Sequence, residues 1–163
     1  MFQEAEKIAA AAAKAAAKAG VKVVVSIVDT HGNPVLLHRM DGAPLHSLDM
    51  AFRKAYTAAS FDVATDELTD QVQPGQPLYG LAVNSGSKLI AFGGGAPAML
   101  STGQKVGVGI SGGTTQEDIA VLSSALGIVA QPRTPALPPR QATLTADRSS
   151  RSHGPVGRPA GSG

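Results

Sequence analysis

The pattern of hydrophobic and polar positions predicts an ordered body over about the first 130 residues. Residues 3–19 are rich in alanine, the best helix former, and Gly20 is a typical helix terminator, so a first helix is predicted there. Residues 21–29 carry mostly β-branched side chains, which favour a strand. A turn at residues 32–33 then leads into a second strand at residues 35–40, and the two strands form a hairpin.

Helical spacing returns at residues 46–61, where apolar side chains fall on one face. Asp49 and Arg53 lie four residues apart in this helix and are expected to pair. Thr65 precedes two acidic residues, a pattern typical of the capped start of a short helix.

The rest of the body is predicted to contain two or three more strands and a last helix. Short strands are predicted at residues 81–84 and 88–92, a glycine-rich turn at residues 93–97, and a strand at residues 105–111. The two glycines inside the last strand indicate a close approach of another backbone. A capping box opens a helix at residues 114–129. Helices at both ends flank hairpin-connected strands, so the fold class is α+β with an antiparallel sheet.

Composition supports one domain, residues 1–130, followed by a tail, residues 131–163. The tail holds six prolines and shows little periodicity, so it is predicted to be disordered. It carries five arginines and one aspartate, whereas the body has nine basic and eleven acidic residues. This distribution, without aromatic residues among the arginines, argues against nucleic-acid binding. The chain has no cysteine and no apolar run of about 20 residues, so neither disulfides nor a membrane span are expected, and a cytoplasmic location is favoured.

Polar chemistry is concentrated between residues 29 and 60, which hold three of the four histidines. Arg39 and Lys54 are candidates to bind carboxylates, and Asp41 is a candidate to orient one of them or to act as a base. The alternative is that Asp41 forms an internal salt bridge that holds the loop. Because no H-x-x-x-H or H-E-x-x-H pattern is present, a dedicated zinc site is not expected. Any one of His31, His38 and His46 is a candidate axial ligand for haem iron, but a surface or hydrogen-bonding role is the preferred interpretation.

Two glycine-rich segments, residues 93–97 and 111–118, suggest either anion binding or tight turns. Neither contains the Gly-Lys-Ser/Thr of a Walker A motif, and no βαβ unit follows the second. Tight turns are therefore the preferred interpretation.

Four segments together resemble the GlcG/HbpS-like family, a haem-binding family associated with haem degradation that includes the C-terminal domain of PduO-type proteins. The segments are VDTHGNPVLLHRMDGAP, RKAYTAASF, GGGAP and VGVGISGGTTQED, in the family's order, and the resemblance covers residues 4–130. It implies a profilin-like α/β/α fold with a five-stranded antiparallel sheet. It also implies homo-oligomers that bind haem or a related tetrapyrrole.

The resemblance also implies a binding site. Its candidate residues are Arg39, Asp41, His46, Lys54, Thr57, Gly94, Gly95 and Pro97. The iron ligand varies within the family, and His46 is the candidate here because it lies beside the loop that enters the second helix.

Three functions remain open at this point. The first is a homo-oligomeric protein that binds haem or a similar small anionic ligand, without a nucleic-acid or membrane partner. The second is an enzyme that acts on a small carboxylate by proton transfer, with Asp41 and Lys54 as catalytic residues. The third is an accessory subunit with no ligand, in which the glycine-rich segments pack subunits together.

Overall fold

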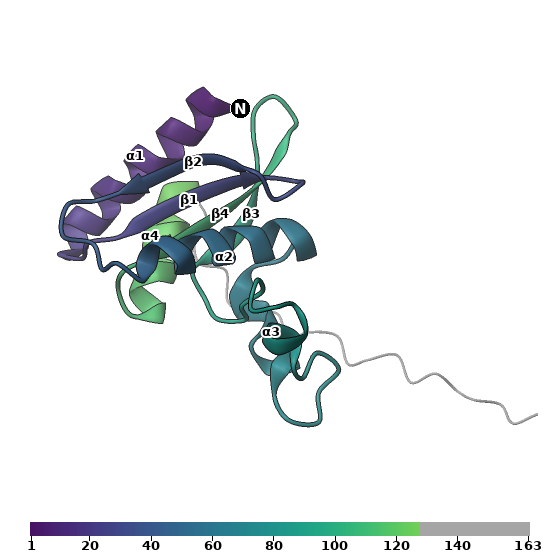
Figure 1. Ribbon diagram of the computed structural model, residues 1–163. Coiled ribbons are helices and arrows are strands. Elements are labelled where there is room, and N and C mark those ends of the chain that lie inside the picture. The colour runs from purple at the N-terminus through teal and green to yellow at the C-terminus, as the bar shows by residue number, and fades with distance from the viewer. Residues whose placement is uncertain (128–163) are drawn as a thin grey trace, which may run out of the picture.

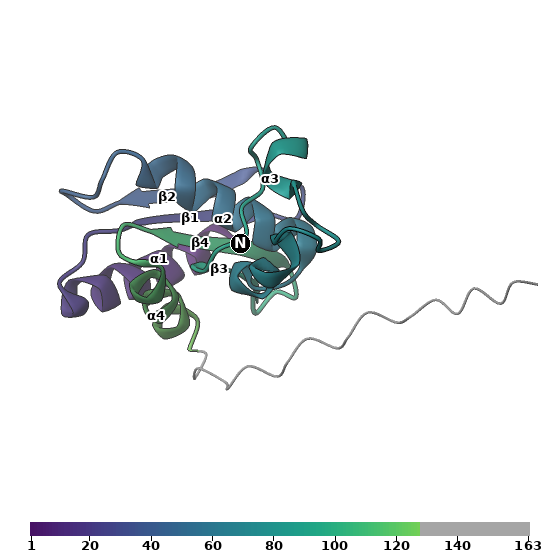
Figure 2. The same ribbon diagram turned by 90° about the horizontal axis from the view of Figure 1, so that it is seen from below.

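The computed structural model describes residues 1–127, and it has the predicted α+β architecture. One antiparallel sheet has α2 on one face and α1 and α4 on the other (Figures 1 and 2). In chain order the helices and strands are α1 (Phe2–Ala19), β1 (Val24–Asp29), β2 (Pro34–Arg39), α2 (Ser47–Phe61), α3 (Leu81–Asn84), β3 (Gly95–Met99), β4 (Lys105–Ser111) and α4 (Thr115–Leu126), with two short 3-10 helices at Thr65–Leu68 and Asp70–Val72.

The sheet has the strand order β2-β1-β4-β3, and every neighbouring pair is antiparallel. Strand β1 is central and pairs with both β2 and β4 along its length. Its first five residues are fully buried because helices cover both faces. This explains why the segment reads as a continuous apolar run rather than an alternating one.

The expected fifth strand is absent from the described residues, so the prediction of a five-stranded sheet was wrong. Residues 81–84 form one helical turn after Gly80, and residues 88–92 form no strand. The predicted turn at residues 93–97 was also partly wrong, because β3 begins at Gly95. Pro97 obscured this strand: proline lacks an N–H and is tolerated only at a sheet edge, which is where β3 lies.

Helices α1 and α4 cover one face of the sheet with small side chains. Four alanines of α1 are buried at helical spacing: Ala5, Ala9, Ala12 and Ala16. They belong to the main core together with residues of β1, β3, β4 and α4. Because alanine projects only one methyl group, α1 packs closely on α4 and the sheet without aromatic residues.

Helix α2 lies directly on β4 because two glycines of the strand face it. A Cβ atom at Gly107 would overlap the carbonyl oxygen of Ala55, and one at Gly109 would overlap that of Ala51. The predicted close approach of another backbone at these glycines is thus confirmed. This close contact with β4 fixes the position of α2, and of its polar residues, near the sheet.

The predicted helix signals were mostly right. Gly20 terminates α1 with φ 74°, and the capping box at α4 forms as expected, with the Thr114 N–H donating to Glu117 Oε2 at 2.7 Å. This bond lowers the pKa of Glu117. Helix α4 ends at Gly127 with φ 66°, before the predicted end at residue 129, which lies outside the described residues, as does the predicted tail.

Thr65 differs from its prediction, because the N-cap position of the 3-10 helix belongs to Ala64. The Thr65 hydroxyl instead donates to the carbonyl of Phe92 and accepts from the N–H of Gly95. Thr65 therefore ties this turn to the start of β3. No helix in residues 1–127 is long and apolar enough to cross a membrane.

Candidate functional site

Lys54 of α2 is a fully buried cation. Its side chain is 1 % exposed, and its Nζ lies 2.6 Å from Asp118 Oδ2 of α4 and 2.8 Å from the carbonyl oxygen of Ile110. The ring centroid of Phe92 lies 5.1 Å from the same nitrogen, close enough for a cation–π contact. The pair therefore connects helices that cover opposite faces of the sheet.

Burial acts on both members of this pair. Removal from water is the largest influence on each, and it lowers the pKa of Lys54 and raises the pKa of Asp118. Their mutual hydrogen bond opposes both shifts, and the N–H of Gly113 also donates to Asp118 Oδ1 at 3.0 Å. The ion pair is therefore hydrogen-bonded to backbone groups as well as internally.

Gly94 and Gly95 leave the space in which Lys54 reaches Asp118. A Cβ atom at Gly94 would lie 2.8 Å from Lys54 Nζ and 2.9 Å from Asp118 Cβ. One at Gly95 would lie 2.6 Å from the Lys54 carbonyl oxygen. This glycine turn therefore makes room for a buried ion pair, in agreement with the preferred interpretation as a tight turn.

Thr57 lies next to this cluster. Its hydroxyl donates to the Arg53 carbonyl at 2.8 Å and accepts from the N–H of Ile90 at 3.0 Å. It attaches the segment before β3 to α2. Four of the predicted site residues, Lys54, Thr57, Gly94 and Gly95, therefore lie together, but as a buried cluster.

The other predicted residues lie elsewhere. Arg39 is exposed, and its guanidinium donates to the Ala43 carbonyl at 2.7 Å and 3.3 Å, which closes the loop between β2 and α2. Asp41 and His46 are exposed in the same loop, with His46 at the N-cap position of α2. The predicted salt bridge of Asp41 does not occur among residues 1–127.

Of the two predicted catalytic residues, Asp41 is exposed and Lys54 is buried. Within residues 1–127, the Lys54 ammonium donates hydrogen bonds to the Ile110 carbonyl and the Asp118 carboxylate, and to no residue of the loop that carries Asp41. No group of three histidine, aspartate or glutamate side chains in the described part of the chain is placed to hold a metal ion. An axial haem ligand needs only one such residue.

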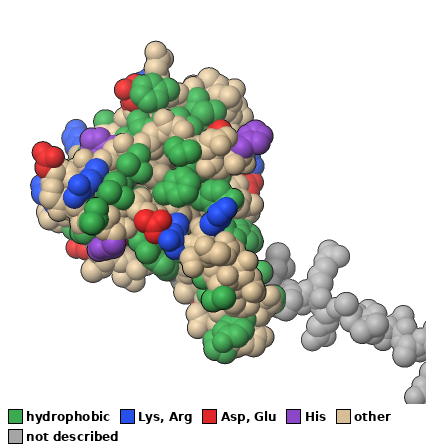
Figure 3. Space-filling model, viewed as in Figure 1, with side chains coloured by type: hydrophobic (Ala, Val, Ile, Leu, Met, Phe, Trp, Pro, Cys, Tyr) green, Lys and Arg blue, Asp and Glu red, His purple; other side chains and the backbone are tan. Residues whose placement is uncertain are grey.

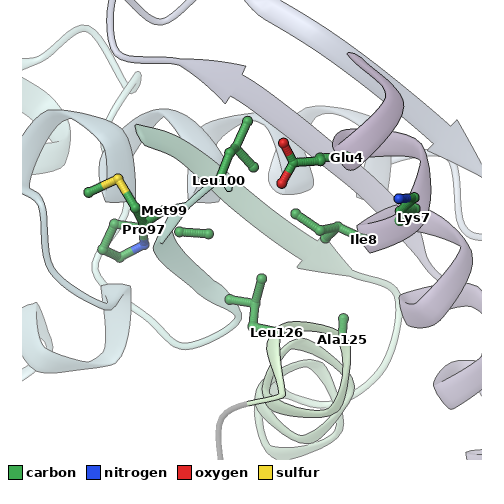
Figure 4. A pocket seen from close by; sticks show the side chains of 9 residues that line it. Glu4, Lys7, Ile8, Pro97, Met99, Leu100, Ala125 and Leu126 are labelled. Atoms are coloured by element: carbon green, nitrogen blue, oxygen red, sulfur yellow. The ribbon is translucent and has the colours of Figure 1, made fainter. Parts of the chain in front are cut away.

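A first cavity, of about 370 Å³, opens between α1, β3 and the end of α4 (Figure 4). Its lining is mainly apolar, with Glu4 and Lys7 at its α1 side: Glu4, Lys7, Ile8, Pro97, Ala98, Met99, Leu100, Ala125 and Leu126. Pro97 thus lines a different surface from the other predicted site residues. The Glu4 carboxylate accepts from the Ser101 N–H at 2.7 Å, a bond that lowers the pKa of Glu4 and places a negative charge here.

A second cavity, of about 230 Å³, lies on the outer side of α2, against residues 86–88. It is lined by Asp49, Phe52, Arg53, Tyr56, Gly86, Ser87 and Lys88. The space-filling view shows acidic and basic side chains close together beside an apolar patch (Figure 3). The predicted Asp49–Arg53 ion pair lies in this lining and is confirmed, with a guanidinium nitrogen of Arg53 2.7 Å from Asp49 Oδ2.

A single antiparallel sheet with α2 on one face and α1 and α4 on the other defines a small α+β protein. The chain belongs to the family described as haem degrading protein HbpS-like, which matches residues 2–127. The resemblance inferred from the sequence is thereby confirmed.

Known relatives agree with this assignment. The chain is 44 % identical over 123 residues to an uncharacterized 15.0 kDa protein of Citrobacter freundii from the dhaT-dhaS intergenic region, covering 75 % of this chain and 86 % of that protein. It is 40 % identical to the corrinoid adenosyltransferase PduO of Salmonella typhimurium, and the match covers 78 % of this chain but only 38 % of PduO. A crystal structure of a PduOC:heme complex superposes with a TM-score of 0.73 at 40 % identity, covering 80 % of this chain and 94 % of that one.

Proposed function

We propose that this protein binds haem or a related tetrapyrrole as a homo-oligomer. The observation that carries the proposal is the relationship to the PduOC chain whose structure is a complex with haem, at 40 % identity over most of both chains. Membership of the HbpS-like haem degrading family supports the same ligand class. The adenosyltransferase activity in the name of PduO is not part of the proposal, since the chain spans only 38 % of that protein.

In this proposal the exposed residues contact the ligand and the buried ones shape the surface. His46 is the candidate iron ligand because its side chain is exposed at the start of α2. Arg39 and Asp41 lie in the same exposed loop, where Arg39 is a candidate partner for a propionate. Lys54, Thr57, Gly94 and Gly95 hold α2 against β3 and β4, and Pro97 lies at the sheet edge.

Titration of the purified protein with hemin tests the proposal. We expect a saturable shift of the Soret band, and a different band position in His46→Ala because the axial ligand is lost. His38→Ala is the matched control, since His38 is also exposed, on β2, and should leave the spectrum unchanged. Absence of any saturable shift would reject haem binding; equal spectra for wild type and His46→Ala would reject His46 as the ligand.

Exposed apolar side chains support the homo-oligomer. Leu45, Tyr79, Val83 and Met99 are each more than 60 % exposed in the isolated chain. Large side chains of this kind are commonly covered at subunit contacts. We expect sedimentation velocity to give a mass of at least two chains, and Val83→Glu to shift it toward one chain; a wild-type protein that sediments as one chain at all concentrations would contradict the oligomer.

A further inference from the structure

Two cavities of the described residues are candidates for an anionic ligand, and charge separates them. The cavity beside α1 is lined by one carboxylate, Glu4, and one exposed amine, Lys7. The cavity on α2 is lined by two cations, Arg53 and Lys88, and by the Asp49 carboxylate that Arg53 already pairs with. Only the second cavity therefore presents a positive charge beyond those balanced by its own acid.

We propose that the α2 cavity binds the carboxylate edge of a planar macrocycle. Arg53 and Lys88, in place of Arg39, are the partners of the two carboxylates, and Phe52 and Tyr56 lie beneath the ring. This assignment rests on the proposed function and names the residues that carry it. A guanidinium and an ammonium are the donors that bind carboxylates in charge-assisted hydrogen bonds.

Arg53 is positioned before any ligand arrives. The Asp49 carboxylate holds its guanidinium at 2.7 Å, while 29 % of the Arg53 side chain remains exposed to the cavity. Lys88 is exposed and has no ion-pair partner within residues 1–127. One cation is therefore fixed and the other is free to follow a flexible propionate.

The aromatic pair gives this cavity an apolar surface. The rings of Phe52 and Tyr56 have centroids 6.1 Å apart at an interplanar angle of 36°, and both side chains are half-buried. Tyr56 is held by Gly32 of the β1–β2 turn, where a Cβ atom would overlap its ring. Flat ligands are bound on rigid aromatic surfaces of this kind.

The opposite wall carries backbone strain. Ser87 has a φ of 63°, a left-handed conformation that residues with a Cβ rarely adopt, and it follows Gly86 at φ 62°. Such strain is retained where the surrounding structure needs a side chain in one place, often at binding sites. Here the turn formed by Gly86 and Ser87 places the next residue, Lys88, in the lining of the cavity.

The size and position of the cavity fit the carboxylate edge of a macrocycle rather than the whole macrocycle. Its volume of about 230 Å³ is below that of typical pockets for complete ligands, roughly 300–1,000 Å³. His46 precedes Arg53 by seven residues on the same side of α2, about 10 Å along the helix axis. A macrocycle whose carboxylates lie at Arg53 therefore extends along α2 toward His46.

Porphyrin titrations test this assignment separately from the choice of iron ligand. Iron-free protoporphyrin IX keeps both carboxylates, and hemin dimethyl ester keeps the iron but loses both charges. We expect Arg53→Ala/Lys88→Ala to weaken binding of hemin and of protoporphyrin IX by at least about ten-fold, the scale of one charge-assisted hydrogen bond. Wild-type protein should bind the dimethyl ester about ten-fold more weakly than hemin.

Lys7→Ala is the matched control, because it removes one exposed amine from the other cavity and should change affinity by less than about two-fold. Circular dichroism would verify that all variants fold. Wild-type affinity of Arg53→Ala/Lys88→Ala for hemin would overturn this assignment and leave the proposed function standing. A larger loss of hemin affinity in Lys7→Ala than in Arg53→Ala/Lys88→Ala would overturn the assignment in favour of the first cavity. Wild-type protein that binds no porphyrin would overturn both the assignment and the proposed function.

Discussion

Asp118→Ala is expected to lower the free energy of unfolding by about 3–5 kcal/mol, the range for breaking one side of a buried ion pair. The reason is that the Lys54 ammonium, 1 % exposed, would lose its counter-ion and keep one hydrogen bond, to the Ile110 carbonyl. The N–H of Gly113 would also lose its acceptor. Urea unfolding followed by far-ultraviolet circular dichroism measures the change.

Lys54→Met/Asp118→Ala distinguishes the ion pair from simple loss of packing. Removal of both charges leaves no buried ammonium, so the double variant should recover roughly 1–3 kcal/mol relative to the sum of the single losses. The control is Lys105→Ala, which breaks the exposed pair of Lys105 with Asp62 and should cost less than about 1 kcal/mol. Equal losses for Asp118→Ala and Lys105→Ala would show that the buried pair does not stabilise the fold.

Gly109→Ala is expected to lower the free energy of unfolding by about 3 kcal/mol, at the upper end of the cost of overpacking. The added methyl group would overlap the Ala51 carbonyl oxygen and lie 2.5 Å from the Ala55 nitrogen. These are backbone atoms of α2, so the whole helix has to move away from β4. Urea unfolding again gives the magnitude.

Gly103→Ala separates steric overlap from backbone conformation. Gly103 has a φ of 80°, yet no atom lies within 4 Å of the position of its missing Cβ. That variant should lose only about 1–2 kcal/mol, the cost of a left-handed residue with a side chain. The close contact between α2 and β4 would be contradicted if Gly109→Ala were no more destabilising than Gly103→Ala.

Local signals in the sequence were sufficient for the elements that depend on local chemistry. The alanine-rich helix, the β1–β2 hairpin, the Asp49–Arg53 pair and the capping box at Thr114 all follow from contacts within a few residues. The glycines of β4 likewise revealed the close approach of α2. Strand β3 was missed because glycine and proline disfavour strands in general, and only the finished sheet shows that Pro97 lies at an edge.

The candidate site was less accessible to sequence reasoning because its contacts join distant residues. Lys54 was recognised as a cation, but its partner Asp118 lies 64 residues away and stood in the sequence only as part of a helix start. Lys88 likewise follows a turn with no motif, and only the fold brings it to the side of α2 that carries Arg53. The buried face of α2 mixes three alanines with Ser47, Lys54 and Thr57, so no apolar pattern marked Lys54 as buried.

A crystal structure of the protein grown with hemin would examine the ligand-binding surface directly. We expect a flat macrocycle along α2, with its carboxylates beside Arg53 and Lys88 and its iron toward His46. Density for the macrocycle between α1, β3 and α4, or crystals of protein that takes up no hemin, would contradict it.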